Sequence, residues 1–228
     1  IKLPVEKQHN YKHTSTLDLF KRIGKVANIA DLFDEFVSSP NLFHYRNKME
    51  YSFSAIGFDH EKNTDVDEFT FGFKRRGVWW MGENLEKDSG LFDKQIEDSL
   101  NRIRTYCENT GLDPWHGPRK EGFFRYLVVR KSYKTDRLLF NLVKTSPELK
   151  KFDLDAFANY LVELFGNRVA GFLHTINDET GDRTIATSGS IDLIYGNDKI
   201  VEELLSLNFE ISMKSFFQTN PKSAEKLY

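Results

Sequence analysis

Cysteine is nearly absent from this chain of 228 residues, which contains only Cys107. A single cysteine excludes an internal disulfide and a metal site built from cysteines, and it is typical of a cytosolic protein. The six histidines are scattered without the spacing that metal ligands need. Cys107 falls on the apolar stripe of an expected helix, which favours a buried structural thiol over a nucleophile. We therefore expect a cytoplasmic protein without a metal centre.

Long apolar runs and glycine-rich loops are also missing. No run approaches the roughly 20 apolar residues of a membrane-spanning helix, and the amino-terminal residues lack the apolar stretch of a secretory signal. No G-x-G-x-x-G loop follows an expected strand, so no such phosphate cradle is predicted. The composition, with 39% hydrophobic and 29% charged residues and a net charge of −2, predicts a folded protein whose basic surfaces must be local.

Apolar residues recurring at steps of three and four predict helices at 16–37, 90–110 and 154–165. Alternation predicts strands at 45–56, 69–73, 78–81, 123–131 and 138–143, with short strands after Val169 and a helix from Ser223. Strands and helices do not alternate regularly, so we expect an α+β fold with helices packed on an antiparallel β-sheet. We divide the chain into a helical segment at 1–40, a central α+β domain at 41–212 and a terminal segment at 213–228.

Basic residues gather on the first strand, at the following hairpin tip and on a later strand: Arg46 and Lys48; Arg75 and Arg76; Arg125 and Arg130. Alternation turns Arg125 and Arg130 to opposite faces of the sheet unless a bulge intervenes. It likewise turns one of Trp79 and Trp80 to the core and the other outward. The spacing alone favours a solvated charged surface, and a surface that contacts phosphates is the alternative.

Two adjacent aromatics stand near the carboxyl end, in the run Phe216-Phe217-Gln218-Thr219-Asn220-Pro221. Taken alone, this run favours a pair of core phenylalanines followed by an asparagine that caps a helix.

Four stretches resemble the RNA uracil-5-methyltransferases that act on transfer and ribosomal RNA. They are residues 45–53, 71–80, 121–130 with 141–143, and 216–228. Their order and spacing agree with that family from Leu17 to Tyr228, and a weaker match lies at 174–178. The resemblance implies a central RNA-binding domain followed by the junction into a catalytic domain.

The resemblance also implies a mechanism for the complete enzyme. A cysteine adds to C6 of a uracil, C5 takes the methyl group of S-adenosylmethionine, and a carboxylate removes the C5 proton. The base must leave its stack to react. The family residue matching Phe216 lies against the target base, and the one matching Gln218 contacts the cofactor. We expect RNA contacts from Arg46, Lys48, Arg75, Arg76, Arg125 and Arg130.

The chain also departs from the family. The nucleophilic cysteine, the cofactor-cradling loop and the catalytic carboxylate would all follow Tyr228. The cysteines that hold an iron–sulfur cluster in some members, and an amino-terminal RNA-binding barrel, have no match here. We therefore expect part of an enzyme, without its Rossmann-like catalytic domain or an iron–sulfur cluster, and no methyl transfer by this chain alone. No protein partner is expected.

Two alternatives stay open on the sequence. The chain is a stand-alone RNA-binding module, or an unrelated α+β domain whose basic patches are only solvated. An open reading frame continuing past Tyr228 would favour the part of an enzyme over the stand-alone module. RNA binding that weakens steeply with salt would argue against the unrelated domain.

Overall fold

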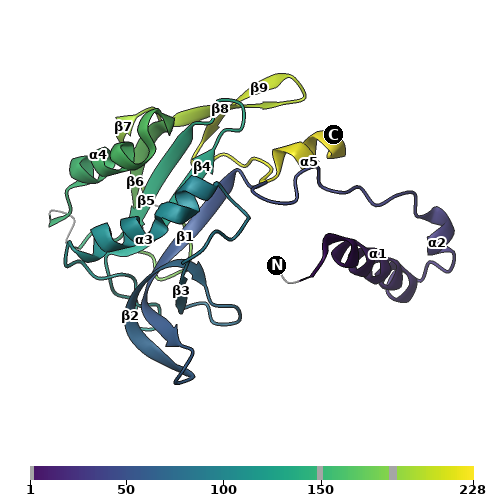
Figure 1. The fold of residues 1–228 in the computed structure, drawn as a ribbon, viewed down its shortest axis with the longest axis horizontal. Coiled ribbons are helices and arrows are strands. Elements are labelled where there is room, and N and C mark those ends of the chain that lie inside the picture. The colour runs from purple at the N-terminus through teal and green to yellow at the C-terminus, as the bar shows by residue number, and fades with distance from the viewer. Residues whose placement is uncertain (1–2, 148–150, 185–188) are drawn as a thin grey trace.

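The computed structural model describes residues 3–147, 151–184 and 189–228, and within them seven strands form one sheet in the order β3-β2-β1-β4-β5-β6-β7 (Figure 1). These strands are β1 (Lys48–Asp59), β2 (Thr64–Lys74), β3 (Gly82–Asn84), β4 (Phe124–Lys131), β5 (Leu138–Lys144), β6 (Val169–Ile176) and β7 (Ile191–Gly196). Neighbouring strands are antiparallel except β5 and β6, which are parallel. The expected antiparallel α+β sheet is thus confirmed in the main. Alternation along a strand cannot predict the parallel pair, which a helical crossover makes possible.

Two helices pack on one face of this sheet, α3 (Lys94–Glu108) and α4 (Leu154–Phe165) (Figure 1). Alternate strand residues, among them Tyr51, Leu127 and Phe140, are buried in the main core with the apolar stripes of both helices. Each helix begins at an aspartate that caps it: Asp93 Oδ1 accepts a hydrogen bond from Ile96 N at 3.3 Å, and Asp153 Oδ1 from Ala156 N at 2.9 Å. The two predicted helices are therefore confirmed.

The opposite face of the sheet is covered over β4, β5 and β6 by a hairpin of β8 (Lys199–Leu204) and β9 (Leu207–Ser212). Ile200 and Ile211 of the hairpin form a second core cluster with strand residues such as Leu173. On β1 the same face carries the small polar side chains of Ser52 and Ser54. We call the β1–β2 part of this face the open face.

A bulge in β4 changes where its arginines point. The register of β4 against β5 shifts between Phe124 and Tyr126. Arg125 therefore lines the same small recess as Tyr126, on the side of the sheet to which Arg130 also points. Simple alternation placed Arg125 and Arg130 on opposite faces, and the bulge corrects that expectation.

The amino-terminal helix differs from its predicted bounds. The structure has α1 (Val5–Arg22) and the short α2 (Ile29–Leu32) in place of one helix at 16–37, and α1 lies away from the sheet (Figure 1). Lys25 adopts φ 53°, a left-handed conformation that ends a helix. The His13 ring packs edge-on against Phe33, with ring centroids 4.5 Å apart. No helix in the described ranges has the length and apolar character needed to span a membrane.

The hairpin tip after β2 also differs from the prediction. Residues 75–81 form a turn, and the last strand of the hairpin, β3, begins only at Gly82. Both Trp79 and Trp80 are partly exposed, and their rings meet edge to face with centroids 5.5 Å apart. The expectation of one buried and one exposed indole on a strand is therefore wrong, because turn residues do not alternate between faces.

Candidate RNA and cofactor interface

Residues 213–220, which we call the junction segment, connect β9 to α5 (Pro221–Leu227) without regular secondary structure. Asn220 caps α5, since its Oδ1 accepts a hydrogen bond from Ser223 N at 3.0 Å. The predicted helix start and its capping asparagine are confirmed. The junction segment lacks the backbone hydrogen bonds of a helix or a sheet, so other contacts must hold it in place.

Asn47 ties the junction segment to the amino end of β1. Its backbone N donates to the Thr219 carbonyl oxygen at 2.8 Å, and its Nδ2 donates to the Gln218 carbonyl oxygen at 2.9 Å. The Asn47 side chain is almost fully buried. The alternation placed Asn47 on the apolar face of its strand but assigned it no role. A polar side chain in a row of apolar ones was the signal that could have identified it.

The two arginines of β4 serve the fold in this structure. Arg125 and Arg130 are only 1% and 3% exposed, and burial lowers the pKa of both guanidinium groups. Arg125 donates to the carbonyl oxygens of Asn177, Glu179 and Gly181, and Arg130 donates to those of Met213 and Ser215. Guanidinium groups committed to buried carbonyls are not presented to a phosphate. We therefore remove Arg125 and Arg130 from the expected RNA-contacting residues and assign Arg130 the role of holding the junction segment.

The two aromatics of the junction segment have opposite environments. Phe217 packs against the second core cluster, with its ring centroid 5.8 Å from that of Phe209. Phe216 is 87% exposed. The neighbouring Gln218 is half-buried, and its side-chain amide makes no hydrogen bond with the described residues, although its backbone is fixed. The expectation of a pair of core phenylalanines therefore holds for Phe217 alone.

Arg46 and Lys48 lie beside the junction segment. Both line a hollow of about 530 Å³ whose wall also includes Met49, Leu91 and Thr219. Arg46 Nε donates to the Lys48 carbonyl oxygen at 3.3 Å, which leaves its terminal nitrogens without a partner among the described residues. Lys48 Nζ pairs with Glu50 at 2.6 Å. The structure thus brings two of the predicted RNA-contacting cations next to Gln218 and its neighbours.

Arg75 and Arg76 lie farther away, at the hairpin tip. Arg75 is engaged within the protein, because its Nη1 is 3.0 Å from Glu83 and its guanidinium carbon is 3.5 Å from the centre of the Phe58 ring. Arg76 is exposed and forms no ion pair with the described residues. Arg76 is therefore the more available of the two for a phosphate.

Cys107 is fully buried on α3, and burial raises the pKa of its thiol. Its local environment therefore disfavours the thiolate that a nucleophile needs. The described residues also contain no group of three or more histidine, cysteine, aspartate or glutamate side chains that could hold a metal ion.

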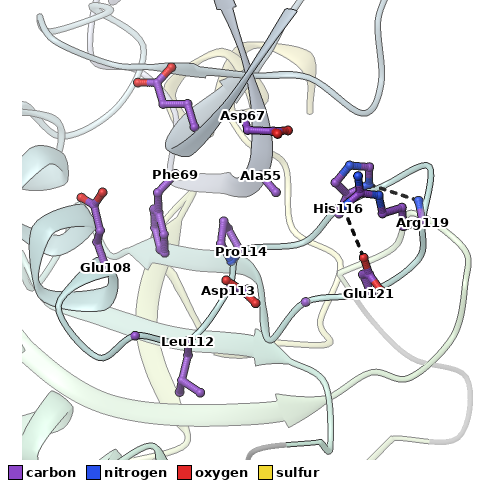
Figure 2. A pocket seen from close by; sticks show the side chains of 13 residues that line it. Ala55, Asp67, Phe69, Glu108, Leu112, Asp113, Pro114, His116, Arg119 and Glu121 are labelled. Carbon is purple, nitrogen blue, oxygen red and sulfur yellow. Dashed lines mark hydrogen bonds and ion pairs between the residues drawn. The ribbon is translucent and has the colours of Figure 1, made fainter.

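A hollow of about 460 Å³ lies between the strands β1 and β2 and the loop that follows α3 (Figure 2). Figure 2 shows apolar Phe69, Ala55 and Pro114 surrounded by acidic side chains, with His116 and Arg119 on one side. The lining carboxylates are those of Asp67, Glu68, Glu108, Asp113 and Glu121. This excess of negative charge makes the hollow a poor site for a nucleic-acid backbone.

Comparison with known proteins relates this chain to RNA methyltransferases, although no family model matches it. An uncharacterised RNA methyltransferase of Clostridium tetani is 35% identical over 99% of this chain, which covers 46% of that relative. A tRNA (uracil(54)-C(5))-methyltransferase of Pyrococcus horikoshii is 25% identical over 85% of the chain and 41% of the relative.

A solved structure supports the fold. The crystal structure of a tRNA (uracil-54, C5)-methyltransferase from Pyrococcus abyssi, in complex with S-adenosyl-L-homocysteine, matches with a TM-score of 0.65 at 22% identity. The match covers 99% of this chain and 47% of that one. The chain therefore belongs to the RNA methyltransferase family that includes the tRNA (uracil-54, C5) enzymes, and it spans about half the length of the relatives it matches.

Proposed function

We propose that this chain is the RNA-docking part of an S-adenosylmethionine-dependent RNA uracil-5-methyltransferase, with Phe216 and Gln218 forming one wall of the methyl-transfer pocket. The observation that carries the proposal is the junction segment. It presents an exposed Phe216 from a backbone anchored by Asn47 and Arg130, beside the cations Arg46 and Lys48. The names of the relatives, which include tRNA (uracil(54)-C(5))-methyltransferases, support RNA as the substrate.

The two kinds of side chain have separate energetic roles. An aromatic ring that stacks on a base contributes about 1–3 kcal/mol, which is comparable to the few kcal/mol needed to take a base out of its stack. Phe216 thus offsets the cost of flipping the target base but leaves little surplus for affinity. The cations must supply that affinity by neutralising phosphates.

Gln218 is the residue of this chain that fits the cofactor. Its backbone is fixed while its side-chain amide is free to donate and accept hydrogen bonds, as a polar ligand group requires. S-adenosylmethionine, when bound, supplies the methyl group. The burial of Cys107 on α3 argues against a role as the nucleophile. We therefore expect that this chain alone gives no turnover with unmodified RNA.

The test is RNA binding as a function of salt concentration. The chain is titrated with single-stranded RNA at several salt concentrations, together with the double variant Arg46→Ala/Lys48→Ala. Loss of two phosphate contacts on a single strand makes the negative slope of log K against log salt shallower by about 1.4 and weakens binding. The matched control is Lys7→Ala/Lys12→Ala, which removes the same charge from exposed positions on α1.

The two double variants separate a specific surface from overall charge. The proposal predicts that the control binds RNA like the unmodified chain. It is contradicted if the chain shows no salt-dependent RNA binding, or if both double variants weaken binding equally.

A further inference from the structure

The two neighbouring indoles at the hairpin tip form an exposed aromatic surface that the proposed function does not use. Trp79 is 50% exposed and Trp80 is 36% exposed. The pair is held in place, because the Trp80 carbonyl oxygen accepts a hydrogen bond from Ser54 Oγ at 2.8 Å. Large aromatic side chains left in water, in a fixed arrangement, are typical of binding surfaces.

A neighbouring loop supports the indoles and carries basic residues a few positions farther along the chain. A Cβ atom at Gly117 would lie 2.8 Å from Trp80 Cβ and 3.1 Å from Trp79 Cζ3, so the backbone of this loop packs directly against both side chains. The loop continues into Arg119 and Lys120, which are exposed. Arg119 approaches Glu121 only at 3.7 Å, and Lys120 has no ion pair among the described residues.

Arg76 adds a further cation to this surface from the tip of the same turn. It is exposed and has no ion pair within the described ranges. Aromatic rings flanked by unpaired cations fit a nucleic acid, since the rings stack on bases while the cations neutralise phosphates. The same set fits an apolar protein partner poorly, because docking would bury unpaired charges.

A hollow on the open face shares lining residues with the recess under the indoles and with the hollow beside the junction segment. This hollow of about 680 Å³ is lined by Glu50, Ser52, Lys74 and Tyr126 and by residues 182–184, where Asp182 pairs with Lys74 and accepts a hydrogen bond from the Tyr126 hydroxyl. Glu50 is shared with the hollow beside Arg46 and Lys48, while Lys74 and Tyr126 are shared with the small recess under Trp79 and Trp80. From Lys48 to Ser54, β1 spans about 20 Å at roughly 3.3 Å per residue. A path of this length takes several nucleotides.

We propose that the RNA continues from the junction segment across the open face, and that Trp79 stacks on an unpaired base several nucleotides from the target uridine. Trp80 holds the Trp79 ring edge-on, and Arg76 and Lys120 contact the flanking phosphates. This inference rests on the proposed function, since it extends the same RNA beyond Phe216. It assigns the chain a preference for RNA with an unpaired stretch.

The test uses the complete chain and ten-nucleotide RNA, single-stranded or paired to its complement, with binding followed by tryptophan fluorescence and by anisotropy of labelled RNA. Trp79→Ala is expected to weaken single-strand binding by about 5-fold or more, which corresponds to loss of at least 1 kcal/mol of stacking. Because an indole carries no charge, the salt slope should not change. Trp79→Phe keeps a ring and should restore most of the affinity.

Three further arms make the outcome decisive. Tyr11→Ala, an exposed aromatic on α1, should bind like the unmodified chain. Arg76→Ala/Lys120→Ala removes two phosphate contacts, so the negative slope of log K against log salt should become shallower by about 1.4. Duplex RNA should be nearly insensitive to Trp79→Ala, because its bases are already stacked, and an equal loss with duplex would overturn the stacking contact.

The inference and the proposed function fail in different ways. If Arg46→Ala/Lys48→Ala weakens binding but Trp79→Ala behaves like Tyr11→Ala, the stacking site is wrong and the junction surface stands. If the unmodified chain binds no RNA, both are wrong.

Discussion

At the scale of single residues, Lys144 on β5 is a buried ammonium group without a hydrogen-bond partner. It is 0% exposed, and its Nζ lies 5.6 Å from the centre of the Phe123 ring. Burial lowers the pKa of Lys144 to about 8, although Asp192 and Asp178 act in the opposite direction. A charge in this position opposes folding, because its hydration is not replaced.

The lowered pKa of Lys144 makes stability depend on pH in the alkaline range. Between about pH 8 and the ordinary lysine pKa of 10.5, the unfolded chain binds more protons than the folded one, so this group makes stability rise with pH. We expect Lys144→Met to be more stable than the unmodified chain at pH 7 by about 1–3 kcal/mol. The gain should shrink toward zero by about pH 10.5. Urea denaturation across this range measures it.

A surface variant provides the control for Lys144. Lys87→Met changes an exposed lysine and should follow the pH profile of the unmodified chain. A stability difference for Lys144→Met that does not vary between pH 7 and pH 10.5 would show that the buried lysine does not titrate there.

At the scale of elements, the start of α3 is joined to β4 and to the turn before β6 through Asp93. Its Oδ2 lies 2.7 Å from Lys131 Nζ and 2.6 Å from Arg168 Nη2, while its Oδ1 caps the helix. Burial alone would raise the pKa of Asp93, but hydrogen bonds from Arg168 and Lys131 outweigh it and lower the pKa to about 2. One carboxylate thus connects three elements of the helix face.

This connection makes the protein sensitive to acid. Between the ordinary pKa of 3.8 and about 2, the unfolded carboxyl binds a proton that the folded one does not, so the stability from Asp93 is present above pH 4 and lost toward pH 2. Asp93→Asn keeps a capping side chain but removes the charge, and it should cost about 2–4 kcal/mol at neutral pH. Its stability should lack the acid-dependent step expected for the unmodified chain.

A nearby surface pair gives the matched control. Asp98→Asn removes a carboxylate that pairs with Lys94 on the exposed side of α3, and it should cost less than about 1 kcal/mol. Equal losses for Asp93→Asn and Asp98→Asn in urea denaturation would contradict the role given to Asp93.

The helices and strands were predicted well where a local sequence pattern, such as a capping residue or an alternation of apolar residues, determines them. Asp153 and Gly166 mark both ends of α4, and alternation located the strands. Failures occurred where the decision was not local. The β4 bulge moves Arg125 to the face of Arg130, and periodicity cannot detect one extra residue. The predicted bounds of the amino-terminal helix were wrong because α1 has no buried residues. The apolar spacing there does not mark a face that packs against the core.

At the scale of the whole molecule, the sheet separates two kinds of surface. The helix face is a packed core, while the open face carries polar side chains, among them Ser52 and Lys74, along the hollow on β1 and β2. Resemblance is the basis for proposing Phe216 and Gln218 as pocket residues, but the sequence did not distinguish buried from presented arginines. Arg125 and Arg130 are buried because backbone carbonyls from distant segments surround them, and such long-range contacts leave no pattern in the local sequence.

The central claim is that the junction segment faces RNA, and photo-crosslinking tests it most directly. RNA containing 4-thiouridine is bound to the chain, irradiated and analysed by mass spectrometry after trypsin digestion. The tryptic peptide 215–222, bounded by Lys214 and Lys222, contains both Phe216 and Gln218. We predict that this peptide carries crosslinked RNA and that Arg46→Ala/Lys48→Ala reduces its yield. Crosslinks confined to α1 or to the helix face, with none in residues 215–222, would contradict the claim.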